Sequence, residues 1–304
     1  MKGVVVKSTG SWYRVRTEKG EYDARLRGKF RNLGLKVTNP IAVGDEVICQ
    51  SEDESHNTLV ITEILQRENY FIRKSTRKTA HAHILASNLD QVVLVASYRG
   101  PRTSRGFIDR FLVATESFGI PTVIVFNKID VLKEKDLIKA KATRAVYEKL
   151  GYKVIQTNAT TGLGVDLLIN ELQDKRTLFA GHSGVGKSTL LNAVDPSLDL
   201  RTGEISSHTD KGVHTTTHAE IFNINDTTEL IDSPGVKEIG LWGMEKTEVS
   251  HYFKEMQALL GQCQFHNCTH DHEPNCEIRD AYMRGDIEES RYVNFLTIIN
   301  EDGL

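Results

Sequence analysis

The sequence predicts an α/β protein with a doubly wound, mostly parallel sheet at its centre, a small β-barrel before the sheet and a helical region after it. Three observations support this fold class. Residues 1–66 contain short runs rich in β-branched and aromatic residues, divided by Gly and Asn/Pro turns. Residues 89–244 alternate between such runs and amphipathic stretches, which is typical of successive βαβ units. Residues 245–304 show helical segments around a Cys/His cluster.

The composition is that of a globular protein. Of the 304 residues, 39% are hydrophobic and 26% are charged, and no run approaches the roughly 18 consecutive apolar residues of a membrane span. The N-terminal residues alternate polar and apolar side chains and lack the zones of a signal peptide. We therefore expect a cytoplasmic protein of two or three domains, without a membrane partner. Nothing in the sequence requires more than a monomer.

Residues 1–66 are expected to form a closed barrel of the OB type, because the predicted strands are short and no helical period interrupts them. Residues 1–40 hold ten Lys or Arg and three Asp or Glu, whereas the whole chain carries a net charge of -3. This asymmetry suggests contact with phosphate, and a solvated charged face is the alternative explanation. Residues 67–88 are polar and basic and are expected to be a linker.

A glycine-rich turn is the clearest motif of the central region, residues 89–244. It follows the predicted strand RTLFA and opens a predicted helix. Glycines let backbone N–H groups surround phosphates at the positive end of a helix, so the pattern predicts a phosphate-binding loop. The side chain of Lys187 is expected to reach the β- and γ-phosphates as a catalytic group, and Ser188 to ligate Mg²⁺. The residues expected to bind the phosphates are Gly181, His182, Ser183, Gly184, Val185, Gly186, Lys187, Ser188 and Thr189.

Two motifs at the ends of other predicted strands are expected to bind the base. Asn127, Lys128 and Asp130 follow the strand TVIVF. A carboxylate can accept hydrogen bonds from both N1–H and the exocyclic amine of guanine, a pair that adenine does not offer. Asp130 therefore predicts selection of GTP and GDP, and argues against a P-loop ATPase or nucleotide kinase. Asn158 and Ala159, after the strand KVIQT, fit a loop that closes over the base.

The last strand of the core ends in a motif suited to Mg²⁺ and the γ-phosphate. Asp232 follows the run TELI and can hold a Mg²⁺-bound water, and the N–H of Gly235 can meet the γ-phosphate. Upstream, Thr216 and Thr217 offer hydroxyls for a second Mg²⁺ contact, and the sequence leaves open which of them makes it. We expect these residues to form the switch regions of the site.

The residue after this motif has a consequence for hydrolysis. Val236 stands where many GTPases carry a Gln that orients the attacking water. An apolar side chain cannot orient water, so turnover is expected to be slow in isolation. Our hypothesis is that His214 positions the water once the switch is ordered, and a surface histidine is the alternative.

The order of these motifs along the chain is unusual. The base-reading motifs come first, then the phosphate loop, the switch threonines and the Asp232 motif, whereas in ordinary GTPases the phosphate loop leads. A circular permutation keeps the sheet and the site but moves the chain ends to a position after the last switch. We therefore predict a circularly permuted P-loop GTPase core whose last switch is held by the C-terminal region.

The C-terminal cluster has the donor set of a zinc site. Three thiols and one imidazole within fourteen residues supply a closed tetrahedral set, so we expect one structural Zn²⁺ with no open position for catalysis. Free buried cysteines are the alternative, because disulfides are rare in a reducing cytoplasm. The expected ligands are Cys263, Cys268, His270 and Cys276, and an exchange of His270 with His266 or His272 stays open.

Taken together, the OB-like region, the motifs NKID, NATTG, GHSGVGKST, HTTTH and DSPG in permuted order, and the Cx4CxHx5C cluster resemble the RsgA (YjeQ) family of bacterial GTPases over nearly the whole chain. The resemblance implies a GTP hydrolase that binds the small (30S) ribosomal subunit and its rRNA late in maturation. A zinc-stabilised RNA-binding module with little catalytic activity is the alternative. Two departures are Asn158, where Ser is more common, and His83, where Gln is expected.

Overall fold

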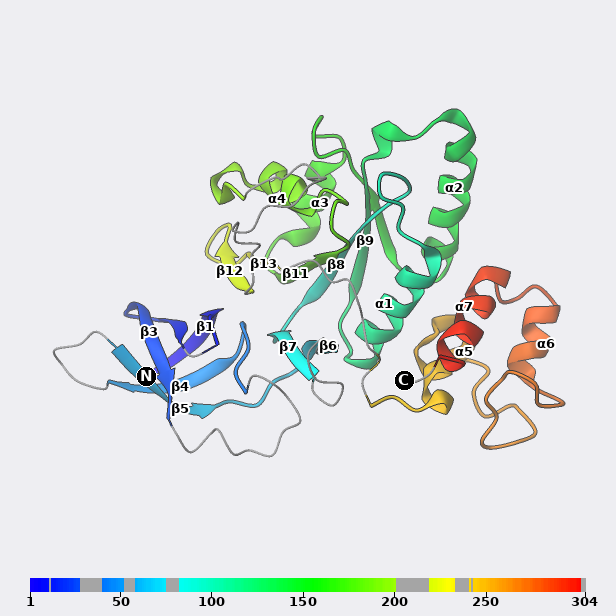
Figure 1. The fold of residues 1–304 in the computed structure, drawn as a ribbon, viewed down its shortest axis with the longest axis horizontal. Coiled ribbons are helices and arrows are strands. Elements are labelled where there is room, and N and C mark those ends of the chain that lie inside the picture. The colour runs from blue at the N-terminus through cyan, green and yellow to red at the C-terminus, as the bar shows by residue number, and fades with distance from the viewer. Residues whose placement is uncertain are drawn as a thin grey trace, which may run out of the picture.

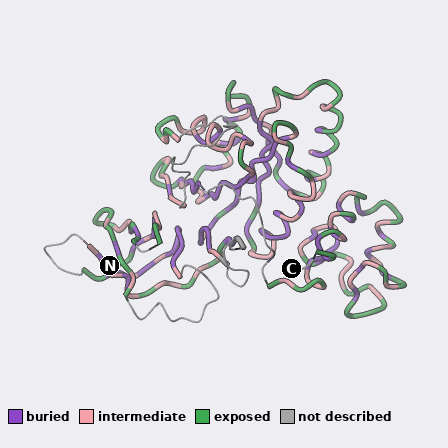
Figure 2. The backbone as a smooth tube through the Cα atoms, in the orientation of Figure 1, coloured by how far each residue is buried: buried purple, intermediate pink, exposed green. Residues whose placement is uncertain are grey.

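The computed structural model describes residues 1–10, 12–27, 40–51, 58–74, 82–200, 219–232, 241 and 243–301. Figure 1 shows a barrel at the N-terminus, a central sheet with helices, and a helical region at the C-terminus. Within these ranges no helix is long and apolar enough to cross a membrane. Buried residues are concentrated in the strands of the central sheet (Figure 2).

The N-terminal barrel confirms the predicted OB-like architecture. Its strands are β1 (Lys2–Ser8), β2 (Tyr13–Thr17), β3 (Gly20–Leu26), β4 (Glu46–Ser51) and β5 (Thr58–Ile64). They follow the order β1-β2-β3-β5-β4, and an additional pairing between β1 and β4 closes the barrel. The alternating residues Val5, Val15, Ala24, Val47 and Ile61 are fully buried inside it. The period of two along each strand therefore separates a small core from the charged outer face.

The central sheet has six strands, β8 (Gln91–Ser97), β9 (Thr122–Asn127), β10 (Lys153–Gln156), β11 (Arg176–Gly181), β12 (Glu220–Asn223) and β13 (Glu229–Asp232). Their spatial order is β10-β9-β8-β11-β13-β12, parallel except for the β12–β13 pair. The chain builds from β8 toward β10 and then returns to β11 on the other side of β8. A sheet of this kind binds ligands at the carboxyl ends of its strands, where the winding direction reverses.

Helices cover both faces of this sheet, as expected for a doubly wound fold. On β8, Val92 and Leu94 pack into one core and Val93 and Val95 into another, because successive side chains point to opposite faces. Helix α1 (Arg105–Ser117) belongs to the first core, whereas α3 (Val165–Leu172) and α4 (Lys187–Val194) belong to the second. The remaining elements of this region are η2 (Ile129–Val131), α2 (Glu134–Lys149) and η3 (Pro196–Leu198).

The segment predicted as a linker contains a β-hairpin. Strands β6 (Tyr70–Lys74) and β7 (Ala82–Ser87) pair antiparallel, and residues 75–81 between them lie outside the described ranges. Phe71 is fully buried and its ring lies 5.4 Å from that of Phe111 on α1. The expected linker, residues 67–88, therefore includes paired strands, whose short apolar runs flank the basic residues that dominate its composition.

The barrel joins the central sheet through β1. Lys7 pairs with Glu220 of β12 in the backbone register, and the Lys7 ammonium lies 2.8 Å from the Glu220 carboxylate. Arg16 of β2 donates to Asn223 at 2.7 Å and to Glu229 at 2.8 Å. These contacts place the barrel beside the edge strand of the sheet, at the end away from α2 (Figure 1).

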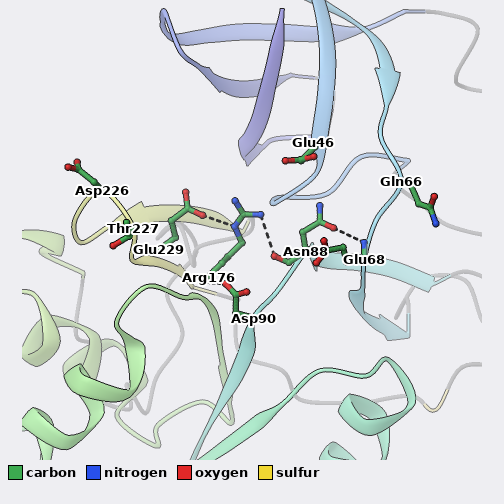
Figure 3. Close-up of a pocket in the computed structure, with 9 residues that line it drawn as sticks. All are labelled: Glu46, Gln66, Glu68, Asn88, Asp90, Arg176, Asp226, Thr227 and Glu229. Atoms are coloured by element: carbon green, nitrogen blue, oxygen red, sulfur yellow. Dashed lines mark hydrogen bonds and ion pairs between the residues drawn. The ribbon is translucent and has the colours of Figure 1, made fainter.

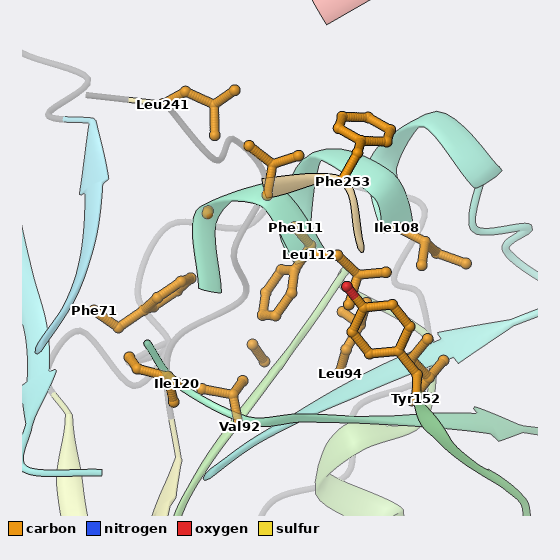
Figure 4. Packing of buried hydrophobic residues seen from close by; sticks show 14 of the residues in the cluster. Phe71, Val92, Leu94, Ile108, Phe111, Leu112, Ile120, Tyr152, Leu241 and Phe253 are labelled. Atoms are coloured by element: carbon orange, nitrogen blue, oxygen red, sulfur yellow. The ribbon is translucent and has the colours of Figure 1, made fainter. Parts of the chain in front are cut away.

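The C-terminal region packs against α1 and shares its core. Its elements are η4 (Lys246–Tyr252), α5 (Lys254–Gln257), α6 (Glu277–Met283) and α7 (Glu289–Ile299). Leu241 and Phe253 belong to the same cluster as Phe111 and Leu112 of α1 (Figure 4). The chain thus returns to the core at Leu241, directly after the undescribed residues 233–240.

A buried ion-pair network reinforces this joint. Arg291 of α7 is 1% exposed and donates to Asp109 of α1 at 2.6 Å and to Glu255 of α5 at 2.6 and 3.0 Å. Asp109 also accepts from Tyr147 of α2 at 2.9 Å. A buried charge is tolerated only when it is paired, so each member of the network depends on the others. The network ties the C-terminal region to two helices of the central region.

Candidate functional site

The strands that precede the predicted motifs end at the same edge of the sheet. In the register of the sheet, Ser97 of β8 lies beside Asn127 of β9, and Phe179 of β11 lies beside Asp232 of β13. The glycine-rich loop leaves β11 at Gly181 and enters α4 at Lys187. The base-reading motif and the phosphate loop, some fifty residues apart in sequence, therefore meet at one edge.

The phosphate loop has the close backbone packing that requires glycine. Gly186 is the N-cap of α4 and has a φ of 88°, in the left-handed region. A Cβ atom there would lie 2.5 Å from the Asn127 side-chain nitrogen. The loop thus leads directly into a helix N-terminus, where backbone N–H groups favour an anion. Ser188 and Thr189 lie in the first turn of that helix and Ser183 is exposed on the loop.

Asn127 connects the two halves of the site. It is 1% exposed, and its Nδ2 donates to the Val185 carbonyl of the phosphate loop at 3.1 Å. Its Oδ1 accepts from the Thr157 hydroxyl at 3.1 Å and from the Ala159 N–H at 3.2 Å. One side chain thus holds the phosphate loop against the loop that was expected to close over the base.

Replacement of Asn127 by Ala should weaken both the fold and nucleotide binding. Unpaired buried donors and acceptors cost about 1–3 kcal/mol each, and loosening the two loops should lower GDP affinity by about tenfold or more. Denaturant unfolding and calorimetric titration with GDP measure the two effects. Asn192→Ala is the control, because Asn192 bridges to Leu200 through two hydrogen bonds away from the site. Equal GDP affinities for the two variants would contradict the assignment.

Lys128 braces the phosphate loop from the other side. Its Nζ donates to the Gly184 carbonyl at 2.7 Å and to the Gly100 carbonyl at 2.8 Å. Gly100 lies in the loop that follows β8, which no sequence motif marked. The position of this loop, after the carboxyl end of a predicted parallel strand, was the one sequence feature that pointed to it. Lys128 therefore links the loops after β8, β9 and β11.

Asp130 and Asn158 differ in what they contact. Asp130, in η2, is exposed and makes no hydrogen bond or ion pair with the described part of the chain, so its carboxylate is free to meet a base. The side chain of Asn158 accepts from the N–H groups of Thr160 and Thr161 at 3.0 and 3.3 Å. Asn158 therefore shapes its own loop, which explains why Asn can replace the more common Ser there.

Lys187 and Asp232 are in direct contact. Their side chains are 11% and 7% exposed, and the ammonium meets the carboxylate across the space between the phosphate loop and β13. Burial lowers the pKa of Lys187 to about 8, and a nearby anion opposes that effect by favouring the charged form. The oxygen that meets the Lys187 ammonium is Asp232 Oδ1, so a metal ion at this carboxylate would take the place of the lysine. These residues fit a Mg²⁺ nucleotide.

The remaining predicted switch residues lie outside the described ranges. They are His214, Thr216, Thr217, Gly235 and Val236. Their roles stay predictions.

One contact of the phosphate loop was not anticipated. The His182 ring lies 3.8 Å from the ring of Phe107 on α1, and burial lowers the pKa of His182. A neutral imidazole packed on an aromatic ring supports the loop from α1. No local sequence pattern predicted it, because the two residues are distant in sequence.

A pocket of about 460 Å³ lies elsewhere, between the barrel and the amino ends of β8, β11 and β13. Figure 3 shows Arg176 directed toward Glu229 and the backbone of Asn88, with further acidic side chains around it. An acidic lining repels phosphate, so this pocket is not the nucleotide site. It is lined by Glu46, Gln66, Glu68, Asn88, Asp90, Arg176, Asp226, Thr227 and Glu229.

The Cys/His cluster has the dimensions of a tetrahedral metal site. The donor atoms of Cys263, Cys268, His270 and Cys276 all lie within 4.8 Å of one another. The thiols of Cys263 and Cys276 are 3.9 Å apart and lie 3.5 and 3.4 Å from His270 Nδ1. Zn–S bonds of about 2.3 Å at tetrahedral angles require sulfurs about 3.8 Å apart, so the residues fit zinc.

The surroundings of the cluster settle which histidine belongs to it. His270 is buried, whereas His266 and His272 are exposed and lie outside the group. The His270 carbonyl accepts from the Tyr292 hydroxyl of α7 at 2.7 Å. Burial raises the pKa of Cys268 to about 12, which favours its protonated thiol in the absence of a cation. A dication held by the cluster would favour the thiolate form.

Comparison with known proteins agrees with the site and the fold. The profile of the RsgA GTPase domain matches residues 64–242, and that of the RsgA N-terminal domain matches residues 2–59. A relative from Cytophaga hutchinsonii, named small ribosomal subunit biogenesis GTPase RsgA, is 48% identical over 302 residues, covering 99% of this chain and 98% of its own. A relative from Bacteroides thetaiotaomicron, named small ribosomal subunit biogenesis GTPase RsgA 2, is 44% identical over 302 residues, with 99% and 97% covered.

Solved structures show the same architecture. The crystal structure of YjeQ from Thermotoga maritima has a TM-score of 0.78 at 36% identity and covers 98% of this chain and 96% of its own. The structure of YloQ, described as a circularly permuted GTPase, has a TM-score of 0.74 at 28% identity, with 98% and 93% covered. Motifs, strand order, metal cluster and relatives agree over the full length, and the chain belongs to the RsgA family of circularly permuted GTPases.

Proposed function

We propose that this protein hydrolyses GTP while it monitors a late step in the assembly of the small ribosomal subunit, with the barrel and the C-terminal region contacting rRNA. The observation that carries the nucleotide part is the convergence of the Asn127 motif and the phosphate loop at one sheet edge. The ribosomal part is supported by the printed names of relatives that match almost the whole chain. The proposal includes a cytoplasmic location, because a ribosomal partner would require it.

The residues of the site have separate tasks in this proposal. Asp130 selects guanine, and the backbone of Ala159 adjoins the base. The phosphate loop, residues 181–189, surrounds the β- and γ-phosphates, and Lys187 leaves Asp232 to meet them. Mg²⁺ bound with the nucleotide would be held by Ser188, Asp232 and a switch threonine, and it would neutralise charge on the phosphate oxygens. Ordering of the switches on the subunit then completes the site.

The zinc proposal concerns stability rather than chemistry. One Zn²⁺ per chain would be held by Cys263, Cys268, His270 and Cys276. Four protein ligands leave no position for a substrate, so the metal shapes the loop between α5 and α6. The loop lacks regular secondary structure from residue 258 to residue 276. Hydrogen bonds from Thr269 to Glu273 and from Tyr292 to the His270 carbonyl also order it.

Asp130→Asn is expected to change the base preference. The amide oxygen still accepts from N1–H, but the amide NH2 replaces the second acceptor with a donor. That donor opposes the exocyclic amine of guanine and matches the carbonyl that xanthine carries at the same carbon. GTP affinity should fall by about a hundredfold or more, and the xanthine nucleotide should bind better than GTP. Competition binding with both nucleotides measures this. Asp136→Asn, on nearby α2, is the control and should keep the wild-type preference. Unchanged preference in Asp130→Asn would remove this residue from its role.

Turnover with and without small ribosomal subunits tests the proposed function as a whole. We expect slow GTP hydrolysis by the isolated chain and a rise of at least about tenfold with subunits, because Val236 cannot orient water. Large subunits serve as the control. A zinc-stabilised RNA-binding module without catalysis would instead bind subunits equally in every nucleotide state and show no stimulated turnover.

A further inference from the structure

Helix α2 carries a basic face that neither the fold nor the nucleotide site uses. The helix buries only Ala140, Thr143 and Tyr147 against the rest of the protein. The rest of the helix surface carries four exposed lysines, together with Ile138, whose exposed fraction is 76%. We call these four lysines the α2 basic face: Lys135, Lys139, Lys141 and Lys149.

The lysines of the α2 basic face lack partners, although acidic residues lie on the same helix. None of the four makes an ion pair or side-chain hydrogen bond with any residue in the described ranges. Of the three carboxylates on the helix, Asp136 pairs with Arg99 and Glu148 with Arg144. The third, Glu134 at the first position, makes no ion pair with a described residue, so one negative charge stands against the four lysines. The positive charge of the face is therefore not neutralised within this part of the chain.

The arrangement costs helix stability, which argues against an incidental surface. Lys135 and Lys139 are four residues apart, and Lys141 and Arg144 are three apart, so like charges are neighbours on the helix. From Lys135 to Lys149 the face extends about 21 Å, at about 1.5 Å of rise per residue. A nucleic acid strand, with about 3.4 Å of rise per phosphate, presents several negative charges over that length. The face therefore matches a polyanion with regularly spaced charge.

We propose that the α2 basic face binds the phosphate backbone of rRNA when the protein is on the small ribosomal subunit. The inference rests on the proposed function and adds a contact surface to it. Helix α2 lies on the side of the central region opposite the barrel, so its lysines cannot extend the barrel's surface (Figure 1). Contacts on opposite sides, at α2 and at the barrel as proposed above, hold the orientation of the core on the subunit better than one contact. Phosphate contacts position a protein without reading sequence.

The test compares two quadruple variants of the α2 basic face. In the first, the lysines become glutamine, which has similar helix propensity but no charge. In the second, they become arginine, which keeps the charge. Affinity for purified small subunits is measured with a non-hydrolysable GTP analogue over a range of salt concentrations. GTP affinity of the isolated variants checks the fold, because none of these lysines belongs to the nucleotide site.

The glutamine variant is expected to bind subunits about tenfold or more weakly, with a log–log salt slope shallower by about 3, if each lysine meets one phosphate. The arginine variant should bind like wild type. Equal affinity and slope for glutamine variant and wild type would overturn the inference and leave the proposed function intact. Wild-type protein that fails to bind subunits would overturn both.

Protein-free rRNA of the small subunit separates RNA from an acidic ribosomal protein as the partner. If the glutamine variant also loses salt-sensitive affinity for this RNA, the contact is to phosphate, as proposed. A loss of affinity for intact subunits alone, with unchanged binding to the free RNA, would assign the face to a protein and overturn the inference.

Discussion

Replacement of Lys187 by alanine is expected to lower the rate of GTP hydrolysis by at least about a hundredfold, the usual effect of removing one preorganised charge that meets the transition state. The Lys187 side chain is 11% exposed, so its charge acts in a poorly solvated space where electrostatic stabilisation is strong. Single-turnover kinetics at saturating GTP measure the chemical step apart from binding. Lys175→Ala is the matched control. Lys175 lies just before β11, at the end of that strand away from the phosphate loop, and it pairs with Glu171.

The pH dependence of GTP binding provides a second readout for Lys187. Burial lowers its pKa to about 8 in the free protein, and phosphate favours the charged form. Wild-type affinity should therefore decrease as pH rises through that range, because the lysine must regain its proton to bind. The affinity of the alanine variant for GTP should not show this decrease with rising pH. A Lys187→Ala protein with wild-type turnover would show that the contact with Asp232 is structural only.

Replacement of Cys276 by serine is expected to abolish zinc binding and unfold the loop between α5 and α6. The Cys276 side chain is fully buried, and its sulfur accepts from the Arg279 N–H at the start of α6. Structural zinc contributes about 10–16 kcal/mol of apparent binding free energy in small domains, which is comparable to the whole stability of a domain. Metal analysis should find far less than one zinc per chain, and amide exchange should lose protection in residues 262–284.

The controls for Cys276→Ser separate the metal from the thiol. Cys49→Ala removes a buried thiol from the barrel core and should retain one zinc per chain. Helix α7 should keep part of its protection in Cys276→Ser, because Arg291 still pairs with the buried Asp109 of α1. A serine variant that binds one zinc and keeps protection in this loop would contradict the assigned ligand set.

The sequence predicted those parts of the site whose residues follow the end of a strand or lie close together in the chain. Strands with a buried run of residues, such as Val92 to Ala96, end at predictable positions, and a parallel sheet brings those ends to one edge. Asn127, Gly181 and Asp232 could therefore be assigned to one site before their contacts were known. The barrel could be predicted in the same way, from short runs of β-branched and aromatic residues divided by turn residues. Four candidate metal ligands within fourteen positions needed only a short loop to bring them together.

Only the tertiary structure decided which distant segments touch. It selected His270 over His266 and His272, placed a hairpin in the predicted linker, and buried Arg291 against Asp109. These outcomes depend on side chains that are far apart in sequence, and local periodicity carries no information about such pairs. The sequence alone determined the elements, the order of the motifs and the chemistry of the donor groups. Packing decided their partners, because burial of apolar surface and pairing of buried charges are settled only when the elements come together.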